Sequence, residues 1–248
     1  MAEILFAAGT DVGLRRPNNE DSHAVLAGAD GETYIVILAD GMGGHQSGEL
    51  ASGTAVRYVR ERITSELRAD MDTNEIRAML ERIVEKANVH VYLQSRSSET
   101  CHDMGTTLTV ALIRGDRMVI GHVGDCRCYL YREPALRQLT ADHTLVQLLV
   151  NRGKLTAEQA RLSPKKNEVT RALGAPEFVK ADMIETHLEK GDRLLFSSDG
   201  LHDYVEEGAI RDILAKTPTP RKTVYRLISL ANSTAGVDNV TCIVGFVQ

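Results

Sequence analysis

The sequence predicts an α+β protein in which antiparallel sheets pack under helices. Strand-like segments occur in neighbouring pairs and helical segments do the same, unlike the strict strand–helix alternation of a parallel sheet. The simplest closure is a four-layer α-β-β-α sandwich, in which two antiparallel sheets are flanked by helix pairs and strand ends gather at one rim. A chain of 248 residues can form one large domain or two small ones, and we expect a single domain over residues 1–248.

Each element has its own signal. Residues 48–68 and 73–93 carry apolar side chains at helical spacing, and Asp72 with Glu75 resembles a capping box before the second helix. Residues 105–113 and 117–123 are strand-like and are joined by a turn of hairpin length. A second helix pair is expected at 205–215 and 220–235, the latter with Thr219 as its cap and Pro220 in its first turn.

One segment interrupts this order. Residues 142–175 contain short helical pieces, an internal Gly153 and a lysine-rich turn at Lys165 and Lys166. Irregular segments of this length are commonly functional loops or lids. We therefore expect a flap over one face of the molecule.

Composition excludes several classes of protein. The net charge is -5 and the pI is near 5.9, so the chain offers no basic field to nucleic acid or to an anionic membrane. No apolar run approaches the ~18 residues of a membrane span, and Glu3 stands where a signal peptide would be basic. We expect a cytoplasmic protein without membrane insertion. The cysteines are too few for a disulfide framework and are expected to be reduced: Cys101, Cys126, Cys128 and Cys242.

Aspartates supply the first functional signal. Four apolar, strand-like runs each stop at an aspartate beside glycine or asparagine, at Asp40, Asp125, Asp199 and Asp238. Carboxylates that converge on one point either take up protons or hold a cation. An all-oxygen cluster suits a hard ion such as Mg2+ or Mn2+, so we expect a metal site.

The loop at residues 13–21 adds a second signal. Arg15 and Arg16 lie close in sequence to Glu20 and Asp21. A guanidinium group can grip two phosphate oxygens, and the acids can orient water bound to a metal. Taken alone, this loop could equally be a solvated charged turn.

Five motifs in a fixed order resemble the metal-dependent Ser/Thr protein phosphatases of the protein phosphatase 2C family. The similarity runs from Gly13 to Asp238, includes landmarks in the flap, and is strongest to the bacterial branch. The motifs are RPNNED at 16–21, DGMGG at 40–44, GDCR at 124–127, SDGL at 198–201 and DN at 238–239.

The resemblance implies a role for each candidate residue. Asp40 would bridge two Mn2+ or Mg2+ ions, the Gly41 carbonyl would bind one of them, and Asp199 and Asp238 would hold the other. Arg16 would bind phosphate, while Glu20 and Asp21 would orient metal-bound water. Asp125 and Asp203 can help to hold a third, weaker ion in the family, although Asp203 could instead cap the 205–215 helix.

The implied reaction is direct hydrolysis of phosphoserine and phosphothreonine by a water that two ions share, without a phosphoenzyme. Phosphoprotein substrates are the implied partners, together with a Ser/Thr protein kinase, and we expect a monomer. The alternative is a catalytically silent relative that binds phosphoproteins or regulators. Such a relative would be expected to have lost metal-binding acids, whereas this chain retains them along with Arg16.

Two departures from the family pattern matter. Met42 stands where eukaryotic relatives have a histidine that is thought to protonate the leaving group, and His45 is not assigned that role. A metal-bound water is the alternative acid. Cys126 replaces the usual serine and lies at Cys-x5-Arg spacing from Arg132, as in cysteine-dependent phosphatases. The intervening RCYLY has no glycine and alternates like a strand, which disfavours a thiolate nucleophile.

Overall fold

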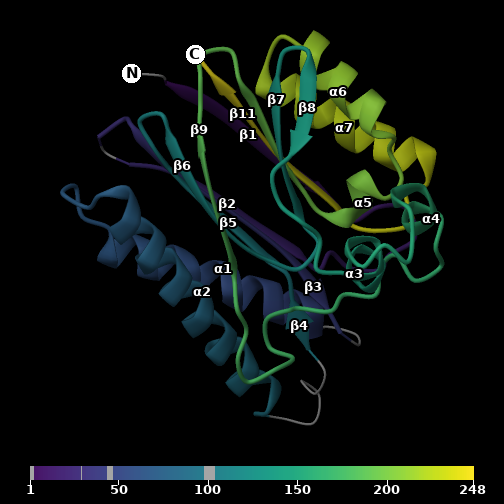
Figure 1. Cartoon of the computed structure of the whole chain (residues 1–248), viewed down its shortest axis with the longest axis horizontal. Coiled ribbons are helices and arrows are strands. Elements are labelled where there is room, and N and C mark those ends of the chain that lie inside the picture. The colour runs from purple at the N-terminus through teal and green to yellow at the C-terminus, as the bar shows by residue number, and fades with distance from the viewer. Residues whose placement is uncertain (1–2, 29, 44–46, 98–103) are drawn as a thin grey trace.

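Two antiparallel sheets form the centre of the molecule in the computed structural model, which describes residues 3–28, 30–43, 47–97 and 104–248 (Figure 1). One sheet has the order β1 (Ile4–Asp11), β11 (Val240–Val247), β10 (Arg193–Ser197), β7 (Arg127–Arg132), β8 (Ala135–Gln138). The other has the order β2 (Asp21–Ala27), β3 (Thr33–Met42), β5 (Leu108–Arg114), β6 (Arg117–Val123), β9 (Asp182–His187), and β4 (Gly105–Thr106) pairs with β3. The predicted α+β class is confirmed.

Two helix pairs cover the sheets. Helices α1 (Ser47–Glu66) and α2 (Thr73–Ser95) pack on the six-stranded sheet, and α6 (Glu207–Lys216) and α7 (Pro220–Thr234) pack on the five-stranded one (Figure 1). The predicted capping box is present, because Asp72 and Glu75 each accept a hydrogen bond from the other's backbone N–H. Within the described residues, no helix is both long and apolar enough to cross a membrane.

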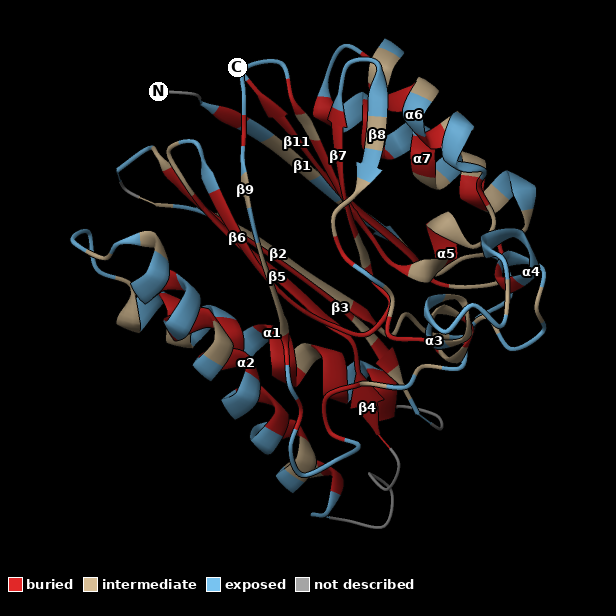
Figure 2. Ribbon diagram, viewed as in Figure 1, coloured by how far each residue is buried: buried red, intermediate tan, exposed pale blue. Residues whose placement is uncertain are grey.

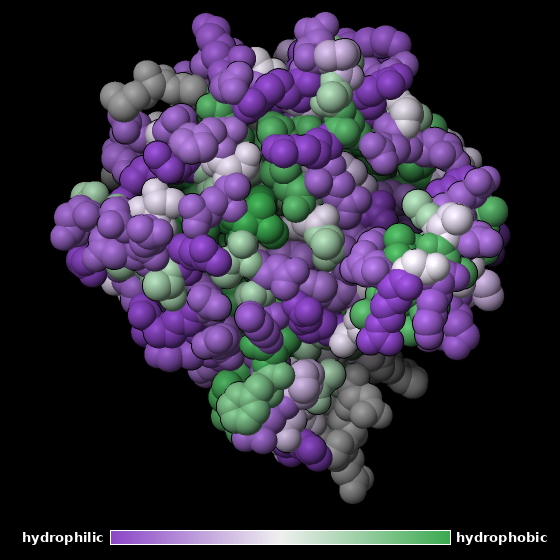
Figure 3. All heavy atoms as spheres, in the orientation of Figure 1, coloured by the Kyte–Doolittle hydropathy of each residue, from purple (hydrophilic) through white to green (hydrophobic). Residues whose placement is uncertain are grey.

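Burial on both faces explains the apolar runs of the central strands. Successive side chains of a strand point to opposite faces, so Ile37 packs under α1 and α2 while Leu38 lies between the two sheets. Likewise Phe196 faces the other sheet and Leu195 faces α6 and α7. Figure 2 shows this buried interior as red strands, and Figure 3 shows hydrophilic residues over most of one face of the molecule. Strands covered on both sides read as nearly continuous apolar sequence.

One open alternative is excluded and one local expectation was wrong. Helix α6 begins at Glu207 with Glu206 as its N-cap, so Asp203 does not cap it; Asp203 instead ends the short helix α5 (Asp199–His202). Asp238 does not end a strand but precedes β11. Because β11 runs antiparallel to β10, with Cys242 opposite Ser197, the start of β11 lies beside the end of β10. Asp238 therefore reaches the same rim as Asp199.

The flap, residues 142–175, contains α3 (Leu145–Asn151) and α4 (Ala157–Arg161) and lies beside α5 (Figure 1). Its two ends are joined, since Thr170 N donates to His143 O and Leu145 N donates to Glu168 O. Its first residue is anchored to β7, because Asp142 binds the Arg127 guanidinium at 2.6 Å. The flap is thus a closed loop fixed beside the rim where the aspartates gather.

Candidate metal centre

Asp21 and Asp40 form the middle of the site. They lie opposite each other where β2 begins and β3 ends. Asp21 Oδ2 accepts hydrogen bonds from Ser198 Oγ at 2.8 Å and Thr241 Oγ1 at 2.6 Å, whereas its Oδ1 is buried without a hydrogen-bond partner. Burial raises the pKa of Asp21 to about 6 despite the two hydroxyl donors. An unpaired buried carboxylate oxygen is costly unless a cation or a proton satisfies it.

Asp40 and Asp199 extend this concentration of like charge. Burial raises the pKa of Asp40 well above its usual value, and the charges of Asp21 and Asp199 raise it further. The pKa of Asp199 is also well above its usual value because of burial, with Asp125 and Asp238 adding to the effect. Both carboxyls would be ionised at neutral pH only if positive charge were supplied nearby.

Glycines beside these aspartates let backbone segments pass in contact. A Cβ on Gly41 would lie 2.1 Å from the Gly48 carbonyl oxygen and 2.7 Å from that of Glu20. A Cβ on Gly200 would lie 1.9 Å from the Asn239 carbonyl oxygen. The Asp-Gly pairs at 40–41 and 199–200 therefore need glycine because another part of the site occupies the side-chain position.

Asn239 and Arg16 connect the 13–21 loop to this rim. Asn239 accepts a hydrogen bond from Glu20 N and donates to the carbonyls of Val12 and Asn18. Arg16 Nη2 lies 2.8 Å from Asp238 Oδ2, and this hydrogen bond raises the pKa of Arg16, which stays a cation. About half of the Arg16 side chain is exposed, so its guanidinium lies at the mouth of the site. Burial raises the pKa of Glu20.

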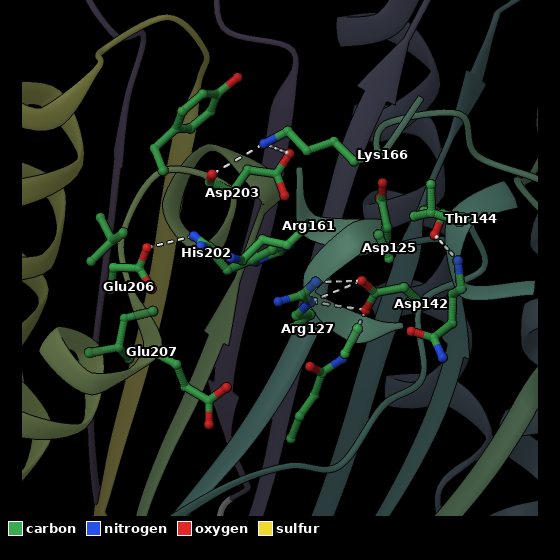
Figure 4. Close-up of a pocket in the computed structure, with 18 of the residues that line it drawn as sticks. Asp125, Arg127, Asp142, Thr144, Arg161, Lys166, His202, Asp203, Glu206 and Glu207 are labelled. Carbon is green, nitrogen blue, oxygen red and sulfur yellow. Dashed lines mark hydrogen bonds and ion pairs between the residues drawn. The ribbon is translucent and has the colours of Figure 1, made fainter. Parts of the chain in front are cut away.

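Asp125 and Asp203 lie in an adjacent cavity of about 380 Å3, shown in Figure 4. Asp125 is only 6% exposed, and its pKa is raised to about 7 by burial and then by the charges of Asp142 and Asp203. The Asp203 carboxylate is 3.0 Å from Lys166 Nζ of the flap. The two acids proposed for a third ion thus line one cavity, and a lysine reaches one of them.

The donor set fits a hard divalent ion in its chemistry, because it consists of carboxylate and carbonyl oxygens. In the ranges that the structure describes, no three His, Cys, Asp or Glu side chains are arranged as a ready-made metal cage. Asp238 and Asp203 instead form ion pairs with Arg16 and Lys166. Asp21 Oδ1, which has no hydrogen-bond partner, is the buried oxygen that a bound ion or its water would satisfy.

The cysteine alternative is excluded by geometry. Burial raises the pKa of the Cys126 thiol well above its usual value, and its sulfur lies 3.2 Å from Thr107 Oγ1. Arg132 is engaged elsewhere, with Asp192 and with the His187 carbonyl. The described cysteines, Cys126, Cys128 and Cys242, are buried and unpaired, as expected. His45 and Cys101 lie outside the described residues.

Sequence reasoning missed the side chains that position the acids. Ser198 and Thr241 hold Asp21, and Thr107 holds Asp40 through its hydroxyl, which accepts from Asp40 N at 2.8 Å. Ser198 directly precedes a predicted ligand and could have been found there. Thr107 and Thr241 have no such signal, because only the pairing of distant strands brings them to the site.

Comparison with known proteins agrees with this architecture. Residues 14–230 match the family model described as Protein phosphatase 2C. The serine/threonine phosphatase stp of Listeria monocytogenes is 39% identical over 232 residues, which cover 94% of this chain and 91% of that protein. The crystal structure of Staphylococcus aureus Stp1 is 32% identical with a TM-score of 0.92, over 100% of this chain and 96% of that one. A PstP catalytic domain in complex with two manganese ions is 38% identical with a TM-score of 0.86, over 100% of this chain and 99% of that one. This chain belongs to the protein phosphatase 2C family.

Proposed function

We propose that this protein hydrolyses phosphoserine and phosphothreonine in proteins by direct attack of water, with two Mn2+ or Mg2+ ions as cofactors. Two such ions, held by the acids at this rim, would lower the pKa of the attacking water and neutralise charge on the phosphate. The observation that carries the proposal is the Asp21–Asp40 pair, in which one buried Asp21 oxygen has no partner beside the like-charged Asp199.

Each acid has a distinct role in this proposal. Asp40 would contact both ions from the end of β3, and the Gly41 carbonyl would contact one of them. Asp199 and Asp238 would hold the other ion. Asp21 is fixed through one oxygen by Ser198 and Thr241, which leaves its other oxygen to accept a hydrogen bond from water and orient it, with Glu20 assisting.

Arg16 would bind the phosphate at the mouth of the site. Its guanidinium carries several N–H donors, and the bond to Asp238 holds it beside the acids without burying it. A charge-assisted grip there would stabilise the negative charge that develops on the transferring oxygens. We assign the leaving-group proton to water, because Met42 has no proton to give.

The rest of the molecule serves this site in our proposal. Residues 1–248 would act as one catalytic domain and as a monomer in the cytoplasm, where the described cysteines would stay reduced, as their unpaired state suggests. A Ser/Thr protein kinase would be among the substrates or would supply them. Asp125 and Asp203 would hold a third, weaker ion.

The central test is hydrolysis of p-nitrophenyl phosphate and of a phosphothreonine peptide. We expect activity with Mn2+, loss of activity with EDTA, recovery when Mn2+ is restored, and loss in Asp199→Asn. Activity that survives both chelation and substitution would contradict the metal mechanism. A silent binding domain would hold the phosphopeptide without turnover, but retention of the metal acids and of Arg16 does not favour it.

The flap would influence which phosphoproteins dock. It lies beside the acidic rim and exposes the apolar side chains of Leu148 and Leu162. Exchanging residues 142–175 for the corresponding segment of the Listeria relative should change relative rates on different phosphopeptides while hydrolysis of p-nitrophenyl phosphate persists. Unchanged peptide preference would contradict this role.

A further inference from the structure

Lys166 of the flap contacts the acidic rim through its ammonium group. Its ammonium group lies 3.0 Å from Asp203 Oδ2 and donates to the Asp203 carbonyl at 3.1 Å, so two oxygens of one residue hold it. The same nitrogen lies 4.8 Å from the centre of the Tyr204 ring. Figure 4 shows the side chain reaching Asp203 on the wall of the cavity that also contains Asp125.

Burial separates this contact from an ordinary surface ion pair. The side chains of Lys166 and Asp203 are 26% and 15% exposed. The neighbouring Lys165 is 61% exposed and pairs with Glu168 inside the flap. Exposed ion pairs such as Lys165–Glu168 contribute little to stability. The charge of a partly buried ammonium group such as that of Lys166 is screened less by solvent. Lys166 therefore supplies the rim with a fixed positive charge, and Lys165 does not.

This charge lies where the proposed third ion would be held. Asp203 is one of the two acids assigned to that ion, and Asp125 faces the same cavity. A divalent ion on Asp203 would lie within a few ångströms of the ammonium group, where two positive charges repel each other strongly. The Asp203 carboxylate can therefore bind either the divalent ion or the Lys166 ammonium group, but not both at once.

The same contact fixes the flap. The next residue of the flap, Asn167, also contacts the rim, since its Nδ2 lies 3.5 Å from Asp199 Oδ2. A second tie, between Arg161 and Glu206, is exposed on both sides and contributes little. Release of Lys166 from Asp203 would therefore remove the best-shielded ion pair between the flap and the α5–α6 segment.

We propose that Lys166 is a tethered competitor of the third divalent ion: its ammonium group neutralises Asp203 while the flap is docked, and an ion bound between Asp125 and Asp203 displaces it and frees the flap. This inference rests on the proposed function, because it presupposes that metal ions bind at this rim. If the exchange of Lys166 for the third ion at Asp203 is one equilibrium, tighter binding of that ion and release of the flap must accompany each other.

Mn2+ binding to the full chain tests the competition. Bound ions are counted by electron paramagnetic resonance in the wild type, in Lys166→Met, which keeps an unbranched stem against Tyr204, and in Lys165→Met as the matched control. We expect the third ion to bind about tenfold more tightly in Lys166→Met, since a nearby like charge has been removed. Lys165→Met should match the wild type, and adding Asp203→Asn to Lys166→Met should abolish the gain.

Hydrogen–deuterium exchange of residues 142–175 tests the coupling. Exchange in the wild-type flap should rise as the third ion binds, and in Lys166→Met it should be high before Mn2+ is added. An unchanged or weaker third ion in Lys166→Met, or wild-type flap exchange that does not rise, would overturn the inference alone. Absence of the two tighter ions in the wild type would overturn the proposed function and this inference together.

Discussion

At the scale of single residues, the site places several buried carboxyl groups close together, which is unfavourable for folding. Asp40, Asp125 and Asp199 all have raised pKa values, caused first by burial and then by neighbouring carboxylates. A residue retained in such surroundings destabilises the metal-free fold, and the usual reason is function. Substitutions that remove one of these charges should therefore separate activity from stability.

Asp199→Asn gives the sharpest separation. We expect hydrolysis with Mn2+ to fall by on the order of 10²–10³, as for loss of one key electrostatic group. The melting temperature in EDTA should stay equal or rise, because a buried like charge has gone. Asp212→Asn is the control, since Asp212 is half exposed and pairs with Lys216. A large fall in the EDTA melting temperature of Asp199→Asn would contradict this interpretation.

The sequence predicted a cluster of acids but not the side chains that hold them, for a physical reason. Asp40, Asp125 and Asp199 each follow an apolar run, which is a local signal. Ser198 and Thr241 contact Asp21 although they are 177 and 220 residues away in sequence. No pattern in the neighbouring residues predicts such a long-range contact. The position of Asp238 was misread because it lies before a strand, although antiparallel pairing still brings it to the rim.

At the scale of elements, the close approach of β3 to α1 depends on Gly41. Gly41→Ala should lower the free energy of unfolding by about 3 kcal/mol or more and abolish activity, because the methyl group would meet the Gly48 carbonyl at 2.1 Å. Gly208→Ala is the control in α6, where a Cβ meets nothing within 4 Å, and it should be neutral or stabilise by up to about 1 kcal/mol. Urea unfolding measures both. Equal effects would show that β3 can shift to accept a side chain.

The attachment of the flap to β7 should depend on one shielded ion pair. The Arg127 and Asp142 side chains are 24% and 10% exposed, and Gln138 also donates to Asp142. Asp142→Asn should lower the free energy of unfolding by about 2–3 kcal/mol, because it leaves Arg127 charged and poorly paired. Glu206→Gln, which breaks an exposed pair with Arg161, should cost less than about 1 kcal/mol. Similar costs in urea unfolding would refute the distinction.

Prediction of elements succeeded for most of the buried elements, with β11 as the exception. Both helix pairs and the strands at the sheet centres have apolar patterns that identify them. The strands at the sheet edges, β1, β2, β8 and β9, were not predicted from the sequence, and each is exposed along part of its length. Such strands mix polar and apolar residues without a clear period. The central strand β11 was missed because the apolar run was taken to end at Asp238, when it begins after it.

At the scale of the whole molecule, the rim joins parts of the chain that lie far apart in sequence. The loop at 13–21, the end of β3 and the start of β11 meet only after both sheets have formed. Ions that bind there bind only the folded chain, so they should stabilise it globally. Each site would contribute about 2.7 kcal/mol when the ion is present at about one hundred times its Kd.

The same linkage fixes the pH dependence of stability. The pKa of Asp125 is about 7 when folded and near 3.8 when unfolded, so the folded state holds the extra proton between these values. Its contribution is present at low pH and is lost as pH rises through about 7. The raised pKa values of Asp40 and Asp199 act in the same direction. Buried His122, with a pKa lowered to about 4, acts in the opposite sense, but only below about pH 6.5.

From about pH 6.5 to about 7.5, the metal-free protein should therefore lose on the order of 1 kcal/mol of stability. In saturating Mn2+ the trend should flatten or reverse, since protons and metal ions compete for the same oxygens. Urea unfolding across this interval, with EDTA or with Mn2+, measures the difference, and Asp125→Asn should reduce the slope in EDTA. If stability in EDTA rose with pH in the wild type, the carboxylates would be ionised without metal, and positive charge from Arg16 and Lys166 would already suffice to hold the rim.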